Sequence, residues 1–213
     1  MSEILKGRVA IITGAGGGLG AAHAKVFSSE GCAVVVNDIN TEAAQSVVDD
    51  IIAAGGKAVA NSSDITNYDD SLNAIKQAIE SYGDLHIVLN NAGVNRDRMF
   101  ASMTEQEWDT IMAVHLKGHF CISSHAVHYW RGRSKEGKPV DARIINTTSG
   151  AGLQGSIGQS NYAAAKAGIA ALTLNQAAEL GRYNITANAV APSARTGMTS
   201  AVPEMAERMA KPE

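Results

Sequence analysis

Short apolar runs of strand length alternate with helical patterns along the whole chain. Six runs rich in Val and Ile predict strands at residues 9–13, 33–37, 57–60, 86–90, 143–147 and 185–190. Apolar residues at helical spacing predict helices at residues 19–29, 41–54, 68–82, 105–130 and 159–182. Continuous apolar strands are typical of a parallel sheet buried on both faces, and the strict alternation predicts a doubly wound α/β fold.

Composition narrows the classes of protein that fit this pattern. The chain has 213 residues, 45% of them hydrophobic, so residues 1–213 are expected to form a single domain. A net charge of -3 and an isoelectric point near 6.1 give no reason to expect nucleic acid or an anionic membrane as a partner. Cys32 and Cys121 show no paired or ligand-like spacing. No apolar run reaches membrane-spanning length, and we expect a cytoplasmic protein with no membrane partner.

The first predicted strand runs directly into a glycine-rich loop, TGAGGGLG. Gly14, Gly18 and Gly20 follow the spacing Gly-x-x-x-Gly-x-Gly, and Leu19 opens the next predicted helix. Glycine allows unusual backbone angles and a close approach of a pyrophosphate, and the free N–H groups of a helix N-terminus favour an anion. A turn that needs glycine for its shape alone is the alternative. The order strand, loop, helix favours a dinucleotide-binding site.

The second predicted strand ends in Asp38, eighteen residues after Gly20. An acidic side chain at this position accepts hydrogen bonds from the adenosine ribose hydroxyls and repels a 2′-phosphate. No Arg or Lys lies in the glycine loop or directly after Asp38 to favour that phosphate. The pattern predicts NAD rather than NADP as the cofactor. The alternative is an aspartate that merely caps a helix.

Three further polar residues follow the fifth predicted strand. Ser149 ends that segment, and Tyr162 and Lys166 lie four residues apart on the next predicted helix, which places them on one face. A tyrosine phenol is a poor base near neutrality, and a neighbouring ammonium favours its ionised form. We expect Tyr162 to move a proton, Lys166 to lower the pKa of Tyr162 and bind the nicotinamide ribose, and Ser149 to hold the substrate oxygen. On its own, this motif is weak evidence for a catalytic site. Its position after the nucleotide-binding loop strengthens that evidence.

These motifs, together with NNAG at residues 90–93, resemble the short-chain dehydrogenase/reductase family over essentially the whole chain. The resemblance implies a Rossmann-type fold in one dinucleotide-binding and catalytic domain that transfers a hydride to or from a hydroxyl or carbonyl carbon. It implies that Asn91 and Gly93 support the cofactor and that Asp64 contacts adenine. It also implies a homodimer or homotetramer that pairs through the fourth and fifth predicted helices.

One position departs from the family pattern. The family usually has a catalytic asparagine in the fourth helix, where it holds a water of the proton relay, and this chain has His115 there. Trp108, Ile111, Met112, His115 and His119 fall near one helical face, which predicts that His115 points inward. His115 either replaces the asparagine in the relay or is a structural buried histidine. The four histidines of this helix lack supporting carboxylates or cysteines, so no metal is expected.

The segments 114–118, 131–155 and 191–199 narrow the resemblance to the hydroxyacyl-CoA dehydrogenase portion of multifunctional enzyme type 2 and its bacterial relatives. This implies an NAD-dependent enzyme acting on a 3-hydroxyacyl-CoA thioester, with a steroid-derived acyl group as one option. The alternatives are a 3-oxoacyl-carrier-protein reductase, another alcohol or steroid dehydrogenase, or a catalytically weak cofactor-binding subunit of a hetero-oligomer. Asp38 argues against the reductase, which usually uses NADPH, and the intact Tyr162 and Lys166 argue against the weak subunit.

The loops after the last three predicted strands are expected to meet the substrate. Their apolar members are Met99, Phe100, Met103, Leu153, Met198 and Met205. Flexible methionines adapt to an irregular apolar group, and Arg96, Arg98 and Arg195 on the same loops are expected to meet CoA phosphates. The alternative is a lid of packed methionines with solvated arginines. The family continues with a further helix and a seventh strand. Either residues after Glu213 complete the pocket, or the chain is a truncated form that lacks its C-terminal strand.

Overall fold

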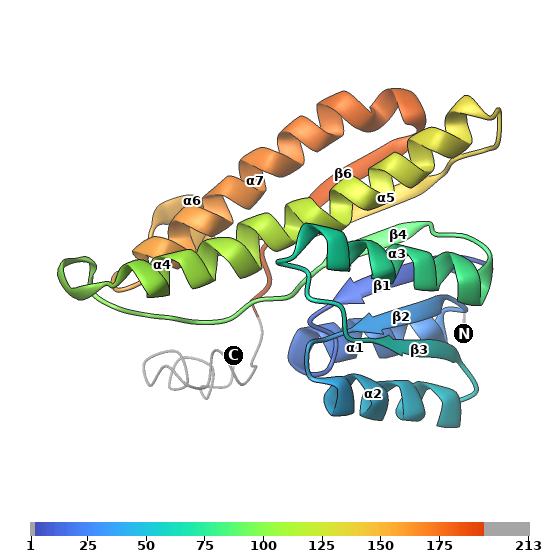
Figure 1. Cartoon of the computed structure of the whole chain (residues 1–213), viewed down its shortest axis with the longest axis horizontal. Coiled ribbons are helices and arrows are strands. Elements are labelled where there is room, and N and C mark those ends of the chain that lie inside the picture. The colour runs from blue at the N-terminus through green and yellow to red at the C-terminus, as the bar shows by residue number, and fades with distance from the viewer. Residues whose placement is uncertain (1–2, 194–213) are drawn as a thin grey trace, which may run out of the picture.

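The computed structural model describes residues 3–193, and six parallel strands form its centre (Figure 1). The strands are β1 (Val9–Thr13), β2 (Ala33–Asn37), β3 (Lys57–Asn61), β4 (Ile87–Asn90), β5 (Ala142–Thr147) and β6 (Ile185–Val190). Their order across the sheet is β3-β2-β1-β4-β5-β6, and every neighbouring pair is parallel. The order reverses direction between β1 and β4, which confirms the predicted doubly wound Rossmann-type fold.

Helices cover both faces of this sheet. They are α1 (Gly18–Ser29), α2 (Thr41–Ala53), α3 (Tyr68–Tyr82), α4 (Glu105–Ile111), α5 (Gly118–Lys135), α6 (Gly150–Gln154) and α7 (Ser160–Leu180). Short helical turns add η1 (Phe100–Ser102), η2 (Met112–Lys117) and η3 (Gly181–Tyr183). Helices α1 and α2 lie on one face, and α3, α5 and α7 lie on the other (Figure 1). None of the helices in this part of the chain is long and apolar enough to cross a membrane.

Strands β1, β2 and β4 are buried on both sides because each face of the sheet has its own core. Successive side chains of a strand point to opposite faces. Val9 and Ile11 of β1 therefore join the cluster that contains Trp130 of α5. Ala10 and Ile12 join the second cluster, on the α1 and α2 side. This two-sided burial explains why the continuous apolar runs predicted the strands so closely.

The prediction of a single helix over residues 105–130 was wrong in one respect. The structure ends α4 at Ile111 and inserts a π-helical segment, η2, before α5 continues to Lys135. A π turn adds a residue and rotates everything after it, and such turns often occur at functional sites. His115 lies in η2 and is 1% exposed, so the prediction that it points inward is confirmed. Trp108 was expected on the same inward face, but it lies one segment earlier and is 36% exposed.

Buried amide side chains join the carboxyl ends of the strands. Asn37 Nδ2 donates to Asn61 Oδ1 over 2.8 Å between β2 and β3. Asn90 Nδ2 donates to Asn146 Oδ1 over 2.8 Å between β4 and β5. Because these four asparagines are the terminal or near-terminal residues of their strands, the bonds hold one edge of the sheet in register. This is the edge where ligands bind in doubly wound sheets.

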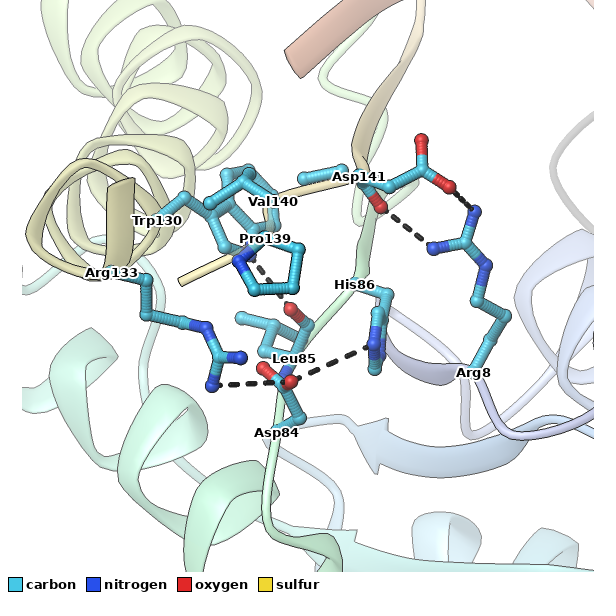
Figure 2. Close-up of a pocket in the computed structure, with 10 residues that line it drawn as sticks. Arg8, Asp84, Leu85, His86, Trp130, Arg133, Pro139, Val140 and Asp141 are labelled. Atoms are coloured by element: carbon cyan, nitrogen blue, oxygen red, sulfur yellow. Dashed lines mark hydrogen bonds and ion pairs between the residues drawn. The ribbon is translucent and has the colours of Figure 1, made fainter. Parts of the chain in front are cut away.

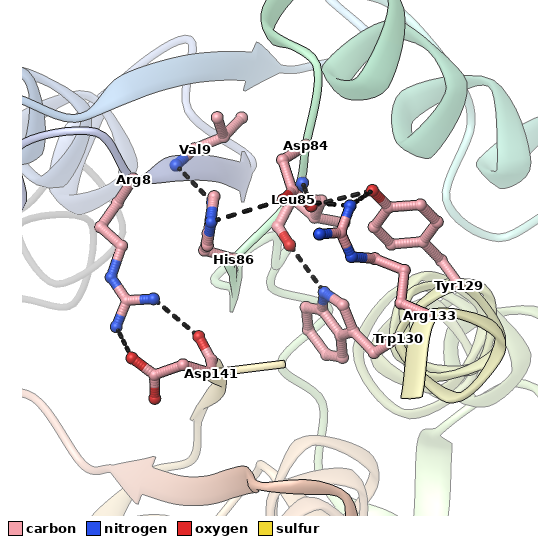
Figure 3. Close-up of polar contacts among 9 residues, drawn as sticks. All are labelled: Arg8, Val9, Asp84, Leu85, His86, Tyr129, Trp130, Arg133 and Asp141. Atoms are coloured by element: carbon pink, nitrogen blue, oxygen red, sulfur yellow. Dashed lines mark hydrogen bonds and ion pairs between the residues drawn. The ribbon is translucent and has the colours of Figure 1, made fainter. Parts of the chain in front are cut away.

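The amino ends of the strands carry a cluster of charged residues at the opposite edge (Figures 2 and 3). Arg8 pairs with Asp141 between the starts of β1 and β5. Arg133 of α5 pairs with Asp84, which precedes β4, over 3.2 Å. His86 accepts a hydrogen bond at Nδ1 from the amide of Val9 over 3.1 Å. A cavity of about 250 Å³ opens between these side chains. Since every ligand-binding motif predicted from the sequence lies at the other edge, we assign this cluster to the stability of the fold.

Candidate active site

The glycine loop turns sharply between β1 and α1, as the spacing predicts. Gly14 and Gly18 have φ angles of 62° and 53°, in the left-handed region that favours glycine. A Cβ atom on Gly14 would lie 2.6 Å from the Cα of Ala92, and one on Gly20 would lie 2.2 Å from the carbonyl oxygen of Gly14. The loop is therefore packed tightly against the end of β4. Leu19 lies in the first turn of α1, whose N-terminal amides face out of the loop.

Asn91 holds this loop in place. Its Nδ2 donates to the carbonyl oxygens of Thr13 and Gly14 over 3.1 and 3.2 Å. Its backbone amide donates to Thr13 Oγ1 over 3.0 Å. The N–H groups of Asn91 are therefore engaged by the strand end and the loop. The expected part of Asn91 in cofactor binding stays a prediction.

Asp38 lies at the end of β2 with its carboxylate facing the glycine loop. Oδ2 accepts from the amide of Gly16 over 3.0 Å, and Oδ1 accepts from the amide of Asn40 over 2.9 Å. The N-cap of α2 is Asn40, whose side chain accepts from Ala43, so Asp38 is not the helix cap that was the alternative interpretation. Its carboxylate retains acceptor capacity next to the loop, as a ribose-binding aspartate requires.

Asp64 follows β3 and closes a local turn. Its Oδ1 accepts from both the amide and the hydroxyl of Thr66, each over 2.8 Å. Its own amide donates to Asp70 Oδ2 over 2.7 Å. These bonds fix the segment at the same edge of the sheet as Asp38, and the expected contact of Asp64 with adenine stays a prediction.

Ser149, Tyr162 and Lys166 lie together at the carboxyl end of β5. Ser149 caps α6, where its Oγ accepts from the amide of Ala151 over 3.2 Å. Tyr162 lies in the first turn of α7, and Lys166 follows one turn later. The Nζ of Lys166 donates to the carbonyl of Thr147 over 2.6 Å and lies 5.6 Å from the centre of the Tyr162 ring.

Helix α6 and its close packing on α7 are features that the sequence analysis missed. A Cβ atom on Gly152 of α6 would lie 2.6 Å from the carbonyl carbon of Lys166 and from the amide nitrogen of Ala167. Only a glycine allows this approach, and the approach brings Ser149 next to the start of α7. The glycines of the segment GAGLQG are the sequence signal that could have indicated this close approach.

Burial dominates the electrostatics of the site. It lowers the pKa of Lys166 from 10.5 to about 7. Burial also raises the pKa of Tyr162, an effect that the Ser149 hydroxyl opposes and the Asp97 carboxylate reinforces. Lys166 is not among the groups that shift the pKa of Tyr162 in this structure. The expectation that Lys166 lowers that pKa therefore stays a prediction.

His115 also lies against the ring of Tyr162. The two rings meet edge to face, with centres 5.2 Å apart at 88°. The Nε2 of His115 lies 2.8 Å from the carbonyl oxygen and 3.1 Å from the amide nitrogen of Val94, so it donates to one or accepts from the other according to its tautomer. Burial, and next the charge of Lys166, lower the pKa of His115 to about 4, so the ring is neutral near pH 7.

Gly93 makes room for His115. A Cβ atom on Gly93 would lie 2.6 Å from Cε1 of that ring. This contact explains why residue 93 is a glycine, independently of any role in cofactor binding. His119 is fully buried one turn further along α5, and burial lowers its pKa well below 6.5. Among residues 3–193, no group of three or more His, Cys, Asp or Glu side chains is arranged to hold a metal ion.

The expected substrate loops carry exposed apolar side chains. Met99, Phe100 and Leu153 are 59%, 74% and 70% exposed. Arg98 pairs with Glu107, because its Nε and Nη2 both donate to Glu107 Oε1 over 2.9 and 2.7 Å. Its expected contact with a CoA phosphate stays a prediction. The guanidinium of Arg96 is exposed and donates to the carbonyl of Asn95 over 2.7 Å. Met103 is half-buried. Three further expected members lie outside the described residues: Arg195, Met198 and Met205.

Comparison with known proteins decides the family. A model of the short chain dehydrogenase family matches residues 8–207. The chain belongs to this family. A solved structure described as a short chain dehydrogenase from Mycobacterium avium has 59% sequence identity and a TM-score of 0.89, and the match covers 92% of this chain and 70% of that one.

Two curated relatives within the short chain dehydrogenases are also similar. Hydroxyacyl-CoA dehydrogenase ChsB1 of Mycobacterium tuberculosis is 49% identical over 93% of this chain and 64% of its own length. Peroxisomal multifunctional enzyme type 2 of Mus musculus is 40% identical over 97% of this chain and 28% of its own length. The chain therefore spans less than two thirds of the length of either relative. Both names agree with the resemblance that the sequence motifs indicated.

Proposed function

We propose that this short chain dehydrogenase is an NAD-dependent enzyme that interconverts a hydroxyl and a carbonyl on a 3-hydroxyacyl-CoA thioester. The observation that carries the proposal is the meeting of Ser149, Tyr162 and a buried Lys166 at the sheet edge where the glycine loop turns. The relatives named as hydroxyacyl-CoA dehydrogenase and multifunctional enzyme type 2 support the substrate class.

The residues of the loop fit a dinucleotide. Gly14 and Gly20 leave no room for side chains, and Gly18 has a φ of 53° that favours glycine. The N-terminus of α1 offers free amides for a pyrophosphate. Asp38 would accept hydrogen bonds from the adenosine ribose, and Lys166 would bind the nicotinamide ribose. When bound, the nicotinamide supplies the carbon that takes up or gives back a hydride.

Residues of the chain itself transfer the proton. In the direction of oxidation, Tyr162 in its ionised form takes the proton of the substrate hydroxyl as the adjacent carbon loses its hydride. Ser149 donates a hydrogen bond to the substrate oxygen and holds it near Tyr162. A protonated Lys166 favours the ionised form of Tyr162. In the direction of reduction Tyr162 gives the proton back.

His115 would take the place of the family's catalytic asparagine. The ring lies against Tyr162, is neutral near pH 7, and has a buried Nδ1 with no protein partner among the described residues. A neutral imidazole offers one donor and one acceptor, so it is able to bind a water as an asparagine side chain does. This supports a part for His115 in the proton relay.

The proposal extends to assembly and location. Phe120 of α5 and Leu174 of α7 are 49% and 74% exposed. A shallow apolar hollow of about 500 Å³ lies along η2 and is also lined by Phe120 and by Leu172 of α7. Exposed apolar patches of this kind are typical of subunit contacts. We therefore include a homodimer or homotetramer in the proposal, together with a cytoplasmic location.

A substrate panel tests the function. The purified protein is offered a 3-hydroxyacyl-CoA, a steroid-derived CoA thioester, the free acids and simple alcohols with NAD, and a 3-oxoacyl-carrier protein with NADPH. Formation or loss of reduced cofactor is read by absorbance. Preference for a CoA thioester with NAD is expected. Preference for the carrier protein with NADPH would favour the reductase, and no turnover with any substrate would favour the weak subunit.

A further inference from the structure

Asn161 lies directly before Tyr162 and is fully buried, yet the mechanism above gives it no part. Its Nδ2 donates to the carbonyl oxygen of Arg96 over 3.1 Å and to that of Glu107 over 3.3 Å. Its Oδ1 accepts from the amide of Tyr162 over 2.8 Å. One side chain therefore joins the loop after β4, the first turns of α4 and the start of α7.

The orientation of this amide is forced by its partners. Two carbonyl oxygens face the nitrogen, and an N–H group faces the oxygen, so a flipped amide would place oxygen against oxygen. All three contacts are with backbone atoms, which means that the side chain holds the paths of three segments. Figure 1 shows that α4 and α7 begin near each other at one end of the molecule, next to α6.

The loop after β4 is tied to the segment before α7 at two more points. The amide of Arg98 donates to the carbonyl of Gly158 over 2.7 Å. Gln159 Nε2 donates to Asp97 Oδ2 over 3.0 Å. These ties lie nearer the surface than Asn161. The loop that carries the exposed Arg96 and Met99 is thus anchored from its inner side by a buried amide next to the proposed catalytic tyrosine.

We infer that Asn161 is a positioning residue that fixes the loop of residues 94–99 relative to Tyr162, and through it the part of the substrate that reaches Arg96. The inference rests on the proposed function for its substrate. Leaving the carbonyls of Arg96 and Glu107 without a donor would release the loop, because a buried unpaired carbonyl is unfavourable. The distance between the reacting group and the CoA phosphates would then vary.

Two variants and a matched control test this inference. Asn161→Ala removes all three hydrogen bonds, and Asn161→Ser places a small polar residue that is tolerated in a first helical turn but does not span both carbonyls. Asn175→Ala is the control, because Asn175 is an exposed asparagine of the same helix that donates to the carbonyl of Ala171. The KM and kcat are measured for a 3-hydroxyacyl-CoA and for the matching pantetheine thioester, which lacks the nucleotide phosphates.

For either Asn161 variant, the KM for the CoA thioester should rise about tenfold, while the KM for the pantetheine thioester changes less than about twofold. Amide hydrogen exchange of residues 94–103 should become faster, with the circular dichroism spectrum unchanged. The control should match the wild type in every measurement. The exchange measurement needs no substrate, so it separates failure of this inference from failure of the proposed function.

Three outcomes would overturn the inference. Unchanged exchange in residues 94–103 would show that the other ties hold the loop. Equal rises of KM for both thioesters would show a general disturbance of the site. Loss of folding in both Asn161→Ala and Asn161→Ser would make Asn161 a determinant of the fold instead.

Discussion

The ammonium of Lys166 donates to the carbonyl of Thr147 over 2.6 Å from a site where the side chain is 2% exposed. A lysine in such a place loses hydration, and its pKa falls to about 7. The hydrogen bond fixes the direction of the side chain and leaves Nζ beside the ring of Tyr162. Small changes in what surrounds Lys166 therefore shift its charge near neutral pH. A bound dinucleotide with its negative phosphates is one such change.

Replacing Lys166 should affect binding and turnover together. Lys166→Ala removes the proposed contact with the nicotinamide ribose and the charge that is proposed to favour ionised Tyr162. We expect the Kd for NAD to rise about tenfold and kcat to fall about a hundredfold or more. Titration by intrinsic fluorescence and steady-state kinetics measure the two effects. A variant that lost turnover with an unchanged Kd would restrict Lys166 to the proton step.

Replacing Tyr162 should affect turnover alone. Tyr162→Phe keeps the ring against His115 and removes the proton, so kcat should fall about a hundredfold or more while NAD still binds. Tyr183→Phe is a matched control, because Tyr183 lies at the far end of α7 in η3. Near-normal turnover in Tyr162→Phe would refute the proposed mechanism.

Asp38 should set the choice of cofactor. Its carboxylate faces the loop at Gly16, so a 2′-phosphate would meet a negative charge, and NAD should bind at least about tenfold more tightly than NADP, or about 1.4 kcal/mol. Asp38→Asn should narrow that difference. Fluorescence titration with both cofactors checks this, and equal affinities in the wild type would remove Asp38 from its assigned role.

His115 should control both activity and acid stability. His115→Asn should keep substantial activity, and His115→Leu should lose most of it.

The unfolded chain protonates this histidine near pH 6.5, but the folded chain does so only near pH 4. Protonation between these values favours unfolding, so wild-type stability should fall, relative to His115→Asn, by up to roughly 3 kcal/mol as the pH drops through this window. Urea unfolding at several pH values measures the difference. Loss of structure in both variants would make His115 a structural residue.

The two arginines of the substrate loop should behave differently. Arg96→Ala should raise the KM for the CoA thioester several-fold and leave the turnover of small alcohols unchanged, because its guanidinium is exposed. Arg98→Ala should instead loosen the start of α4, because Arg98 pairs with the Glu107 that closes the Thr104 capping box. Kinetics and thermal unfolding separate the two effects. No preference for the CoA ester in the wild type would contradict the substrate proposal.

Most of the fold could be predicted because strands such as β1, β2 and β4 are buried on both faces. Runs such as those of β1 and β2 contain almost no polar residue, and they predicted strand positions within one or two residues. The π segment around His115 could not be predicted, because it depends on how the chain packs against Val94 and Tyr162 and not on periodicity. The short α6 has no apolar period, and its position depends on Gly152 meeting α7.

The candidate site was predicted in its residue types and less well in its contacts. Tyr162 and Lys166 share a helix face because of their spacing, which sequence shows directly. The contacts of Asn91 with the glycine loop and of Arg98 with Glu107 join segments far apart in the chain or in different turns. Sequence spacing contains no information about such partners. For this reason the sequence did not predict that Asn91 donates to the glycine loop or that Arg98 pairs with Glu107, and their expected contacts with cofactor and substrate stay predictions.

The charged cluster at the amino ends of the strands has a consequence for how this protein can change. Arg8 with Asp141 joins the starts of β1 and β5, and Asp84 with Arg133 joins the segment before β4 to α5. These pairs lie at the opposite end of the strands from Tyr162, and no residue belongs to both sets. Distant substitutions without common partners have nearly additive effects. Substitutions at the amino ends of the strands could therefore change the thermal stability, and substitutions at the carboxyl ends could change the substrate. We expect little epistasis between the two groups of substitutions.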